Sequence, residues 1–174
     1  MDHITINNLN LIKKEVSLEN KNVNIIAVSK TFPPAKILPL VKNGHIHYGE
    51  NKVQEAIGKW TGIKSEFKNV KLHLIGKLQT NKVKFILPLF DYIHSLDNEK
   101  LAKKISIQQE KENFRPKIFI QVNIGNEPQK VGINPKDLEY FFLNCKEKLN
   151  LDIIGLMCIP PNELKSEKYF DQLS

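Results

Sequence analysis

Val23-Asn24-Ile25-Ile26-Ala27-Val28-Ser29 is an apolar run of strand length that ends directly at Lys30. Such a run predicts a buried strand with the amine of Lys30 at its carboxyl end. Desolvation there disfavours the ammonium form and favours a neutral, nucleophilic lysine. Lys30 is therefore a candidate to form a Schiff base with a carbonyl compound. The alternative is an ordinary strand-end lysine, with its stem on apolar surface and its head in water.

Strand-like and helix-like segments alternate along the rest of the chain, after a first amphipathic segment from about Ile6 to Asn20. The further predicted strands are 46–48, 71–76, 92–96, 117–123 and 151–159. Strict alternation predicts a parallel sheet with its ligand site at the carboxyl ends of the strands. An open doubly wound sheet and a βα-barrel both fit this pattern.

Capping residues predict where several helices begin. Pro33-Pro34 suits the start of one helix. Asn51, with Gln54 three residues on, predicts the N-cap of a helix that runs through Trp60. Asp97 predicts the N-cap of a helix through about Gln109.

Composition limits the class of protein. The chain has 174 residues, of which 41% are hydrophobic and 26% charged, so one globular domain over residues 1–174 is expected. A net charge of +7 could serve a nucleic acid, an anionic membrane surface or a phosphorylated ligand. The basic residues are nearly all lysine and are spread over helical stretches, so a solvated surface explains them equally well.

Cysteine spacing and the N-terminus point to a reducing compartment. Cys145 and Cys158 stand far apart, without the spacing of a zinc or dithiol site. No signal peptide or membrane span is recognised, so we expect a cytoplasmic, soluble protein. His45 and His47 flank the second strand and could pair with His73 on the next, but carboxylates or cysteines are missing and no metal is assigned.

Polar residues gather at the predicted strand ends, where parallel α/β folds assemble their sites. Each has a structural alternative, because helix capping, tight turns and core packing use the same residue types. The candidates are Ser29-Lys30, Gly49-Glu50-Asn51, Gly76, Gln79, Asn81, His94-Ser95, Asn123 and Met157-Cys158.

Several ordered motifs resemble one family. They are Ala27-Val28-Ser29-Lys30-Thr31, Tyr48-Gly49-Glu50-Asn51-Lys52-Val53-Gln54-Glu55, His73-Leu74-Ile75-Gly76-Lys77-Leu78-Gln79-Thr80-Asn81-Lys82, Ile93-His94-Ser95-Leu96-Asp97, Gln121-Val122-Asn123 and Gly155-Leu156-Met157. In order and spacing the chain resembles the pyridoxal phosphate homeostasis proteins, relatives of the alanine racemase N-terminal domain.

The resemblance implies a (β/α)8 TIM-barrel-like fold that holds pyridoxal 5'-phosphate (PLP) as a Schiff base on Lys30. Asn51 and Met157 match family positions beside the cofactor, and His73, Gln79 and Asn81 match other positions of the pocket region. It also implies a monomeric protein that binds, buffers and delivers PLP to PLP-dependent apo-enzymes, without assigned catalysis.

Compared with the family, about six of the eight βα units are recognised. The family's strands 7 and 8, which cradle the phosphate, have no counterpart in this sequence. We therefore expect weak PLP binding, or none, and exposed edges on the first and sixth strands.

Two other classes of function remain as alternatives. A barrel enzyme of the racemase or aldolase type would use Lys30 in catalysis. Catalysis on PLP needs a further acid or base, for which Tyr48 and His94 are the nearest candidates. Tyr48 also suits a strand residue packed between layers. A nucleic-acid-binding module is supported by charge alone, so no nucleic acid partner is expected.

Overall fold

Six parallel strands form one sheet in chain order, from β1 to β6. The computed structural model describes residues 3–19, 22–125, 131–161 and 167–173. The strands are β1 (Ala27–Val28), β2 (His47–Glu50), β3 (Lys71–Leu74), β4 (Tyr92–Leu96), β5 (Lys117–Gln121) and β6 (Asp152–Met157). A doubly wound sheet would reverse its strand order near the middle, whereas a barrel keeps it. The barrel-type expectation, with six βα units, is confirmed.

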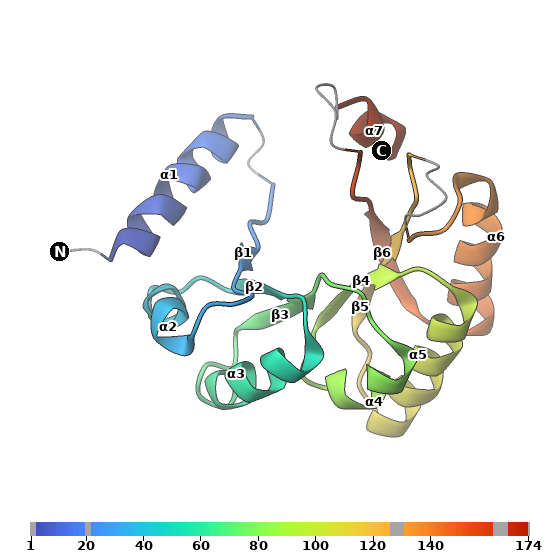
Figure 1. The fold of residues 1–174 in the computed structure, drawn as a ribbon, viewed down its shortest axis with the longest axis horizontal. Coiled ribbons are helices and arrows are strands. Elements are labelled where there is room, and N and C mark those ends of the chain that lie inside the picture. Colours follow the sequence, from blue (N-terminus) through green and yellow to red (C-terminus); the bar gives the residue numbers. More distant parts are fainter. Residues whose placement is uncertain (1–2, 20–21, 126–130, 162–166, 174) are drawn as a thin grey trace.

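Helices cover the outer side of this curved sheet, as Figure 1 shows for α2 to α6. The inner side faces the open space between α1 and α7 in the same view. The helical elements are α1 (Ile4–Glu19), α2 (Pro34–Lys42), α3 (Val53–Glu66), η1 (Thr80–Lys82), α4 (Val83–Ile86), α5 (Glu99–Glu112), η2 (Pro135–Asp137), α6 (Leu138–Leu143), a π-helical turn η3 (Asn144–Lys148) and α7 (Glu167–Leu173).

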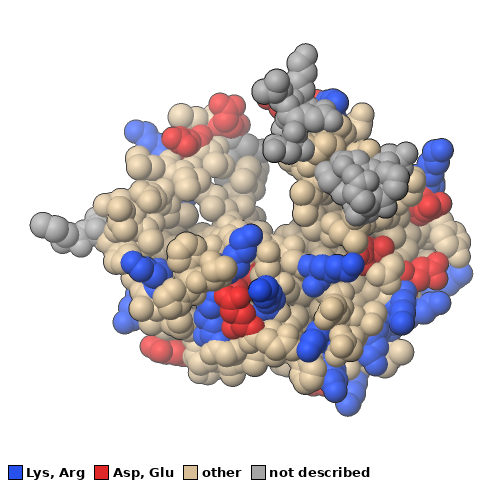
Figure 2. Space-filling view, viewed as in Figure 1, with Lys and Arg blue, Asp and Glu red and all other residues tan. Residues whose placement is uncertain are grey.

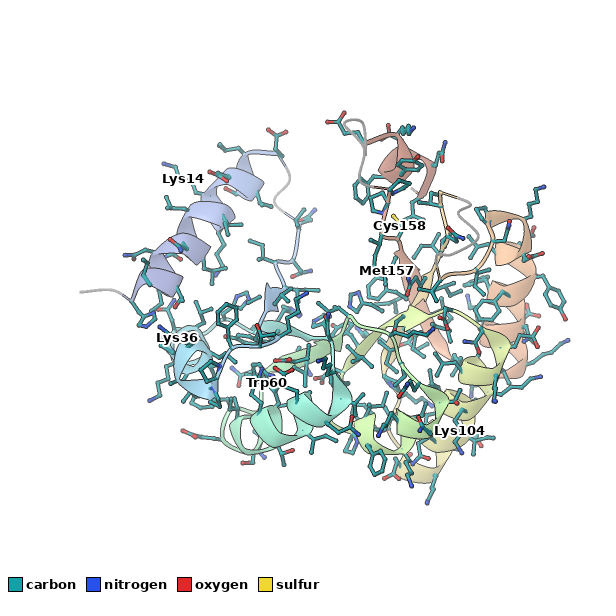
Figure 3. All side chains as sticks on the ribbon, in the orientation of Figure 1. Lys14, Lys36, Trp60, Lys104, Met157 and Cys158 are labelled. Carbon is teal, nitrogen blue, oxygen red and sulfur yellow. The ribbon has the colours of Figure 1, made fainter. Side chains whose placement is uncertain are left out.

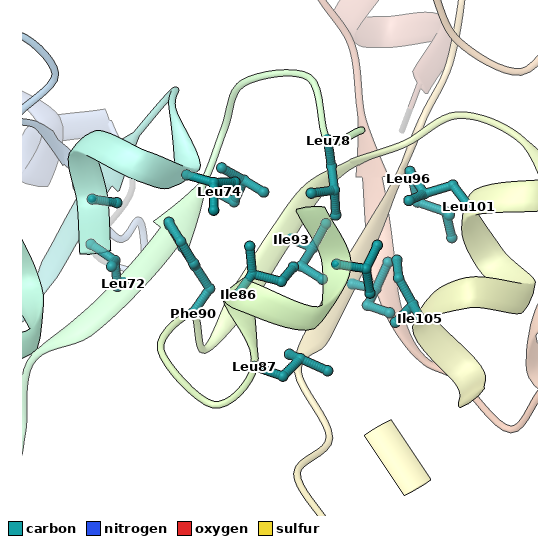
Figure 4. Packing of buried hydrophobic residues seen from close by; sticks show 14 of the residues in the cluster. Leu72, Leu74, Leu78, Ile86, Leu87, Phe90, Ile93, Leu96, Leu101 and Ile105 are labelled. Atoms are coloured by element: carbon teal, nitrogen blue, oxygen red, sulfur yellow. The ribbon is translucent and has the colours of Figure 1, made fainter. Parts of the chain in front are cut away.

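The hydrophobic core lies between the sheet and its outer helices. Alternation along β3 turns Leu72 and Leu74 toward the helices, and both are fully buried. Figure 4 shows them with Ile86, Phe90 and other side chains of the same cluster. Alternation places the residues between them, such as His73, on the inner face of the sheet.

Two predicted helix starts are wrong. The residue before α3 is Lys52, and no side chain caps that helix. Asn51 instead lies in a bend after β2, where its backbone comes close to Gly76. At α5 the cap is Asn98, whose Oδ1 accepts the Leu101 N–H at 2.9 Å.

The first strand is shorter than its apolar run predicts. Only Ala27 and Val28 form β1, although the Ser29 N–H continues the pairing by donating to the Gly49 carbonyl at 2.9 Å. Val23 and Asn24 are exposed. Within the described ranges, β1 and β6 each pair with one strand only, which leaves two open edges. No helix in those ranges has the length and apolar character needed to cross a bilayer.

Candidate cofactor-binding site

Lys30 follows β1 at the carboxyl edge of the sheet, where the sequence predicted it. Val28 pairs with Gly49, and its side chain lies near that residue on the inner face. Alternation beyond Val28 assigns Ser29 to the helix side and Lys30 to the inner side. Lys30 is exposed, however, so the partial burial expected from the sequence is not found. The reason is that β1 is an edge strand within the described chain.

A buried network of polar side chains holds Ser29, the residue before Lys30. Glu50 has no solvent exposure, and its Oε1 accepts hydrogen bonds from Ser29 Oγ (2.8 Å), Lys59 Nζ (2.8 Å) and Trp60 Nε1 (2.9 Å). Figure 3 shows Trp60 between α3 and the strands. Lys59 also donates to the Ser29 carbonyl at 2.8 Å. These contacts fix the residue before Lys30 to β2 and α3.

The residue after Lys30 is held by the same helix. Thr31 has a φ of 66°, a left-handed conformation that β-branched residues rarely adopt. Its N–H donates to Glu55 Oε1 at 2.8 Å, and the same oxygen accepts Lys59 Nζ at 3.1 Å. The hydrogen bond from the Thr31 N–H, followed by that from Lys59, lowers the pKa of Glu55. Both neighbours of Lys30 are therefore tied to α3.

Asn51 and Gly76 meet where β2 and β3 end. A Cβ on Gly76 would lie 2.3 Å from the Asn51 carbonyl oxygen and 2.7 Å from its Cα. Only glycine allows these two backbones to approach so closely. The sequence indicated that Gly76 lets the backbone turn. The close approach of Asn51 is the specific reason why this residue is a glycine. Asn51 itself is half-buried at this edge.

Gln79 shares a cleft with Asn51, whereas Asn81 does not. The cleft is about 490 Å³ and lies between the start of α3 and the segment after β3, with Lys52, Lys77 and Lys82 on its walls. Asn81 lines a separate groove with Lys100 and Lys103 of α5. Figure 2 shows the basic side chains, Lys and Arg, spread over one face of the molecule.

His73 belongs to a ladder of three histidines across β2, β3 and β4. His47 Nδ1 lies 2.9 Å from His73 Nε2, and His73 Nδ1 lies 2.9 Å from His94 Nε2. The pairing of His47 with His73, considered from the sequence, is confirmed. The ring of His73 stacks on Tyr92 at 4.1 Å, and that of His94 stacks on Phe119 at 4.4 Å. We call these three residues the histidine ladder.

Burial keeps the histidine ladder neutral near pH 7. Desolvation, followed by repulsion from His94 and His47, lowers the pKa of His73 to about 3. Desolvation lowers the pKa of His94 to about 4 and also lowers that of His47. No group of three or more His, Cys, Asp or Glu residues in the described chain is arranged to hold a metal ion.

Met157 ends β6 and pairs with Gln121 of β5. Two residues earlier, Gly155 pairs with Phe119, and a Cβ there would lie 3.2 Å from the Phe119 ring. Phe119 contacts the histidine ladder, so alternation assigns Met157 to the same inner face. Figure 3 shows Met157 and Cys158 at the upper end of β6.

The structure thus brings only some of the predicted residues together. Asn51 and Gln79 come together, His73 and Met157 belong to the inner face, and Asn81 lies in an outer groove. Sequence reasoning missed Lys59 and the role of Glu50. The signal available was their spacing of nine residues, with Trp60 next to Lys59, but only the crossover geometry of α3 brings them together.

A sequential parallel sheet with outer helices, and a lysine two residues after its first strand, is the arrangement expected of a barrel of the alanine racemase type. The family model described as "Alanine racemase, N-terminal domain" matches residues 4–173. A pyridoxal phosphate homeostasis protein of Haemophilus influenzae is 35% identical over 160 residues, which cover 88% of this chain and 68% of that protein. The chain belongs to the pyridoxal phosphate homeostasis protein family.

Other relatives agree in sequence and in structure. The pyridoxal phosphate homeostasis protein of Aquifex aeolicus is 39% identical over 137 residues, or 79% of this chain, and the match spans 59% of that relative's length. PipY of Synechococcus elongatus PCC7942, solved with PLP bound, has a TM-score of 0.79 at 31% identity and covers 93% of this chain and 78% of its own. An alanine racemase of Clostridium difficile 630 has a TM-score of 0.67 at 12% identity, with 94% and 46% covered, which shows the shared fold alone.

Proposed function

We propose that this chain binds PLP, though weakly, and serves its homeostasis in the cytoplasm, holding the cofactor on Lys30 without catalysing a reaction. The observation that carries the proposal is the placement of Lys30 at the carboxyl end of β1, on a turn fixed from both sides by α3. PipY, at 31% identity, supports the choice of ligand because it was solved with PLP bound.

The residues present fit the aldehyde and ring of PLP. Lys30 is exposed and would hold the cofactor through its aldehyde carbon, by a C=N bond formed with loss of one water molecule. When bound, PLP supplies an electron sink. Asn51 and Met157 are the residues we assign to the ring, and His73 lines the inner face below. Gln79 and, further out, Asn81 are assigned to the rim.

The environment of the candidate acids and bases favours a carrier over a racemase or aldolase. Tyr48 is fully buried against Trp60, with ring centroids 4.8 Å apart, which confirms that it packs between layers. Burial raises the pKa of its hydroxyl, so it is a poor base. The Nε2 of His94 lies 2.9 Å from the Nδ1 of His73, and the lowered pKa of His94 keeps its ring neutral at pH 7. Neither residue is free to move a substrate proton.

The first experiment is an absorbance titration with PLP, followed by borohydride reduction and peptide mapping. We expect an imine band and a reduced adduct on Lys30, and loss of both in Lys30→Ala. Lys36→Ala is a matched control, because Lys36 is another exposed lysine, on the neighbouring helix α2. An adduct spread evenly over surface lysines, and unchanged by Lys30→Ala, would refute the assignment.

Partners and assembly follow from the same proposal. We propose that the protein acts as a monomer and passes PLP to PLP-dependent apo-enzymes, and that neither nucleic acid nor membrane is a partner. The alternative, a Schiff-base enzyme that acts directly on a carbonyl substrate, would trap that substrate on Lys30 upon reduction, with no PLP chromophore.

A further inference from the structure

The turn that carries Lys30 is held by three charged side chains, Glu50, Glu55 and Lys59, which we call the carboxylate clamp. Lys59 is the centre of the clamp, because its side chain is 6% exposed and its ammonium has three acceptors. They are the Ser29 carbonyl at 2.8 Å, Glu50 Oε1 at 2.8 Å and Glu55 Oε1 at 3.1 Å. An ammonium has three N–H donors, so this set satisfies all of them.

Each arm of the clamp ends on a residue next to Lys30. On one side, Lys59 and Glu50 hold the carbonyl and hydroxyl of Ser29. On the other side, Glu55 accepts the N–H of Thr31. The backbone of Lys30 therefore spans two fixed points, both of them on α3 or on the strand that precedes it.

The clamp also holds a conformation that the chain would not adopt unaided. A φ of 66° at Thr31 is unfavourable for a β-branched residue and persists only where surrounding contacts enforce it. The Thr31 N–H donates to Glu55 Oε1, and this hydrogen bond holds the backbone of Thr31 in that conformation. Without that hydrogen bond, Thr31 lowers its conformational energy by returning to a negative φ. This change in φ reorients the peptide that follows Lys30.

We infer that Lys59 and Glu55 are positioning residues, which fix the direction of the Lys30 amine by holding Ser29 and Thr31. The expected effect on the reaction of Lys30 with PLP rests on the function proposed above. The expected effect on the backbone at Thr31 does not. Lys59 has all its donors occupied by buried or partly buried acceptors, so it acts through Lys30 rather than as a second amine for the cofactor.

The test compares Lys59→Met with Lys64→Met. Lys64 is the matched control because it also lies on α3 and makes an equivalent pair of contacts, to the Leu89 carbonyl at 2.7 Å and Asp91 Oδ2 at 2.5 Å, away from Lys30. Hydrogen exchange of the Thr31 amide is measured by NMR in each variant, and the rate of reductive modification of Lys30 by PLP is measured by peptide mapping.

We expect the Thr31 amide to exchange at least about tenfold faster in Lys59→Met, because hydrogen bonds to charged groups are strong. The rate of reductive modification of Lys30 by PLP should fall by about the same factor. Lys64→Met should change neither. Glu55→Ala gives a second variant at a partly exposed site, with a side chain 32% exposed, in case Lys59→Met fails to fold. Glu55→Gln keeps an acceptor for Thr31 and should retain most of the protection.

Two outcomes would overturn the inference. One is unchanged Thr31 exchange in both Lys59→Met and Glu55→Ala, and the other is an equal effect on Lys30 in Lys59→Met and Lys64→Met. Absence of any PLP adduct on Lys30 in the wild-type chain would refute the proposed function instead. In that case the Thr31 exchange rates alone still decide whether the clamp positions the turn.

Discussion

Gly76 shows how a single missing side chain can shape the site. Its backbone lies so close to Asn51 that a Cβ would come within 2.3 Å of a carbonyl oxygen. Backbone atoms cannot swing aside as a flexible side chain does, so any larger residue must push β2 and β3 apart at their carboxyl ends.

Replacing this glycine should therefore destabilise the fold. We expect Gly76→Ala to reduce the free energy of unfolding by about 3 kcal/mol, the upper part of the range for overpacked sites. Gly58→Ala is the control, since a Cβ at that position of α3 meets nothing within 4 Å. It should raise stability by about 0.5–1 kcal/mol, because alanine is the better helix former. Urea unfolding measures both, and equal effects would contradict this account.

At the scale of the helices, the cap of α5 is the clearest difference between expectation and structure. Asn98 and not Asp97 accepts the Leu101 N–H. Asp97 accepts a hydrogen bond from the side chain of Asn98 instead. Both residues are common caps, and sequence alone does not say which of two neighbours starts the first turn.

A pair of substitutions tests this assignment. Asn98→Ala should cost about 1 kcal/mol of stability, the usual loss for removing an N-cap. Asp97→Ala should cost less than half as much, because no backbone N–H of α5 depends on it. The measurement is chemical denaturation of each variant against the wild type. A larger loss in Asp97→Ala would restore the prediction made from the sequence.

The sequence predicted elements better than their ends. It placed β4 over Tyr92–Leu96, as observed, because apolar and polar residues alternate between clear boundaries. It extended the first strand to Val23, although only Ala27 and Val28 pair, because an apolar run does not reveal which residues find a neighbouring strand. It placed Lys30 at the end of the first strand, but it did not predict the carboxylate clamp, whose members meet only once α3 has packed on the sheet.

The histidine ladder links three strands, so its protonation concerns the whole molecule. In the unfolded chain a histidine takes up its proton near pH 6.5, whereas in the fold His73 and His94 do so only near 3 and 4. Between these values the unfolded state binds more protons, and stability therefore falls as the pH decreases. Near pH 7 the stabilisation is almost fully present.

We expect a loss of about 2–4 kcal/mol between pH 7 and pH 5, since each unit of pH costs about 1.4 kcal/mol per ring. His73→Leu should make the free energy of unfolding less dependent on pH. Asn98→Ala, as a control, should lower the free energy of unfolding equally at pH 7 and pH 5. Urea unfolding at pH 7 and pH 5 measures this. The pKa of Glu55 is also lowered, but the stability that this contributes is lost only as the pH falls below the ordinary value of 4.5, outside this window. Identical slopes in wild type and His73→Leu would contradict the assignment.

Because strand order follows chain order, each strand that leaves the ribosome pairs with the strand synthesised just before it. A growing chain of this kind can add one strand and one helix at a time, and among the described strands each pairs with one that is next to it in the sequence. Short separations between contacting segments favour rapid assembly and shorten the time for which apolar surface is exposed to other nascent chains.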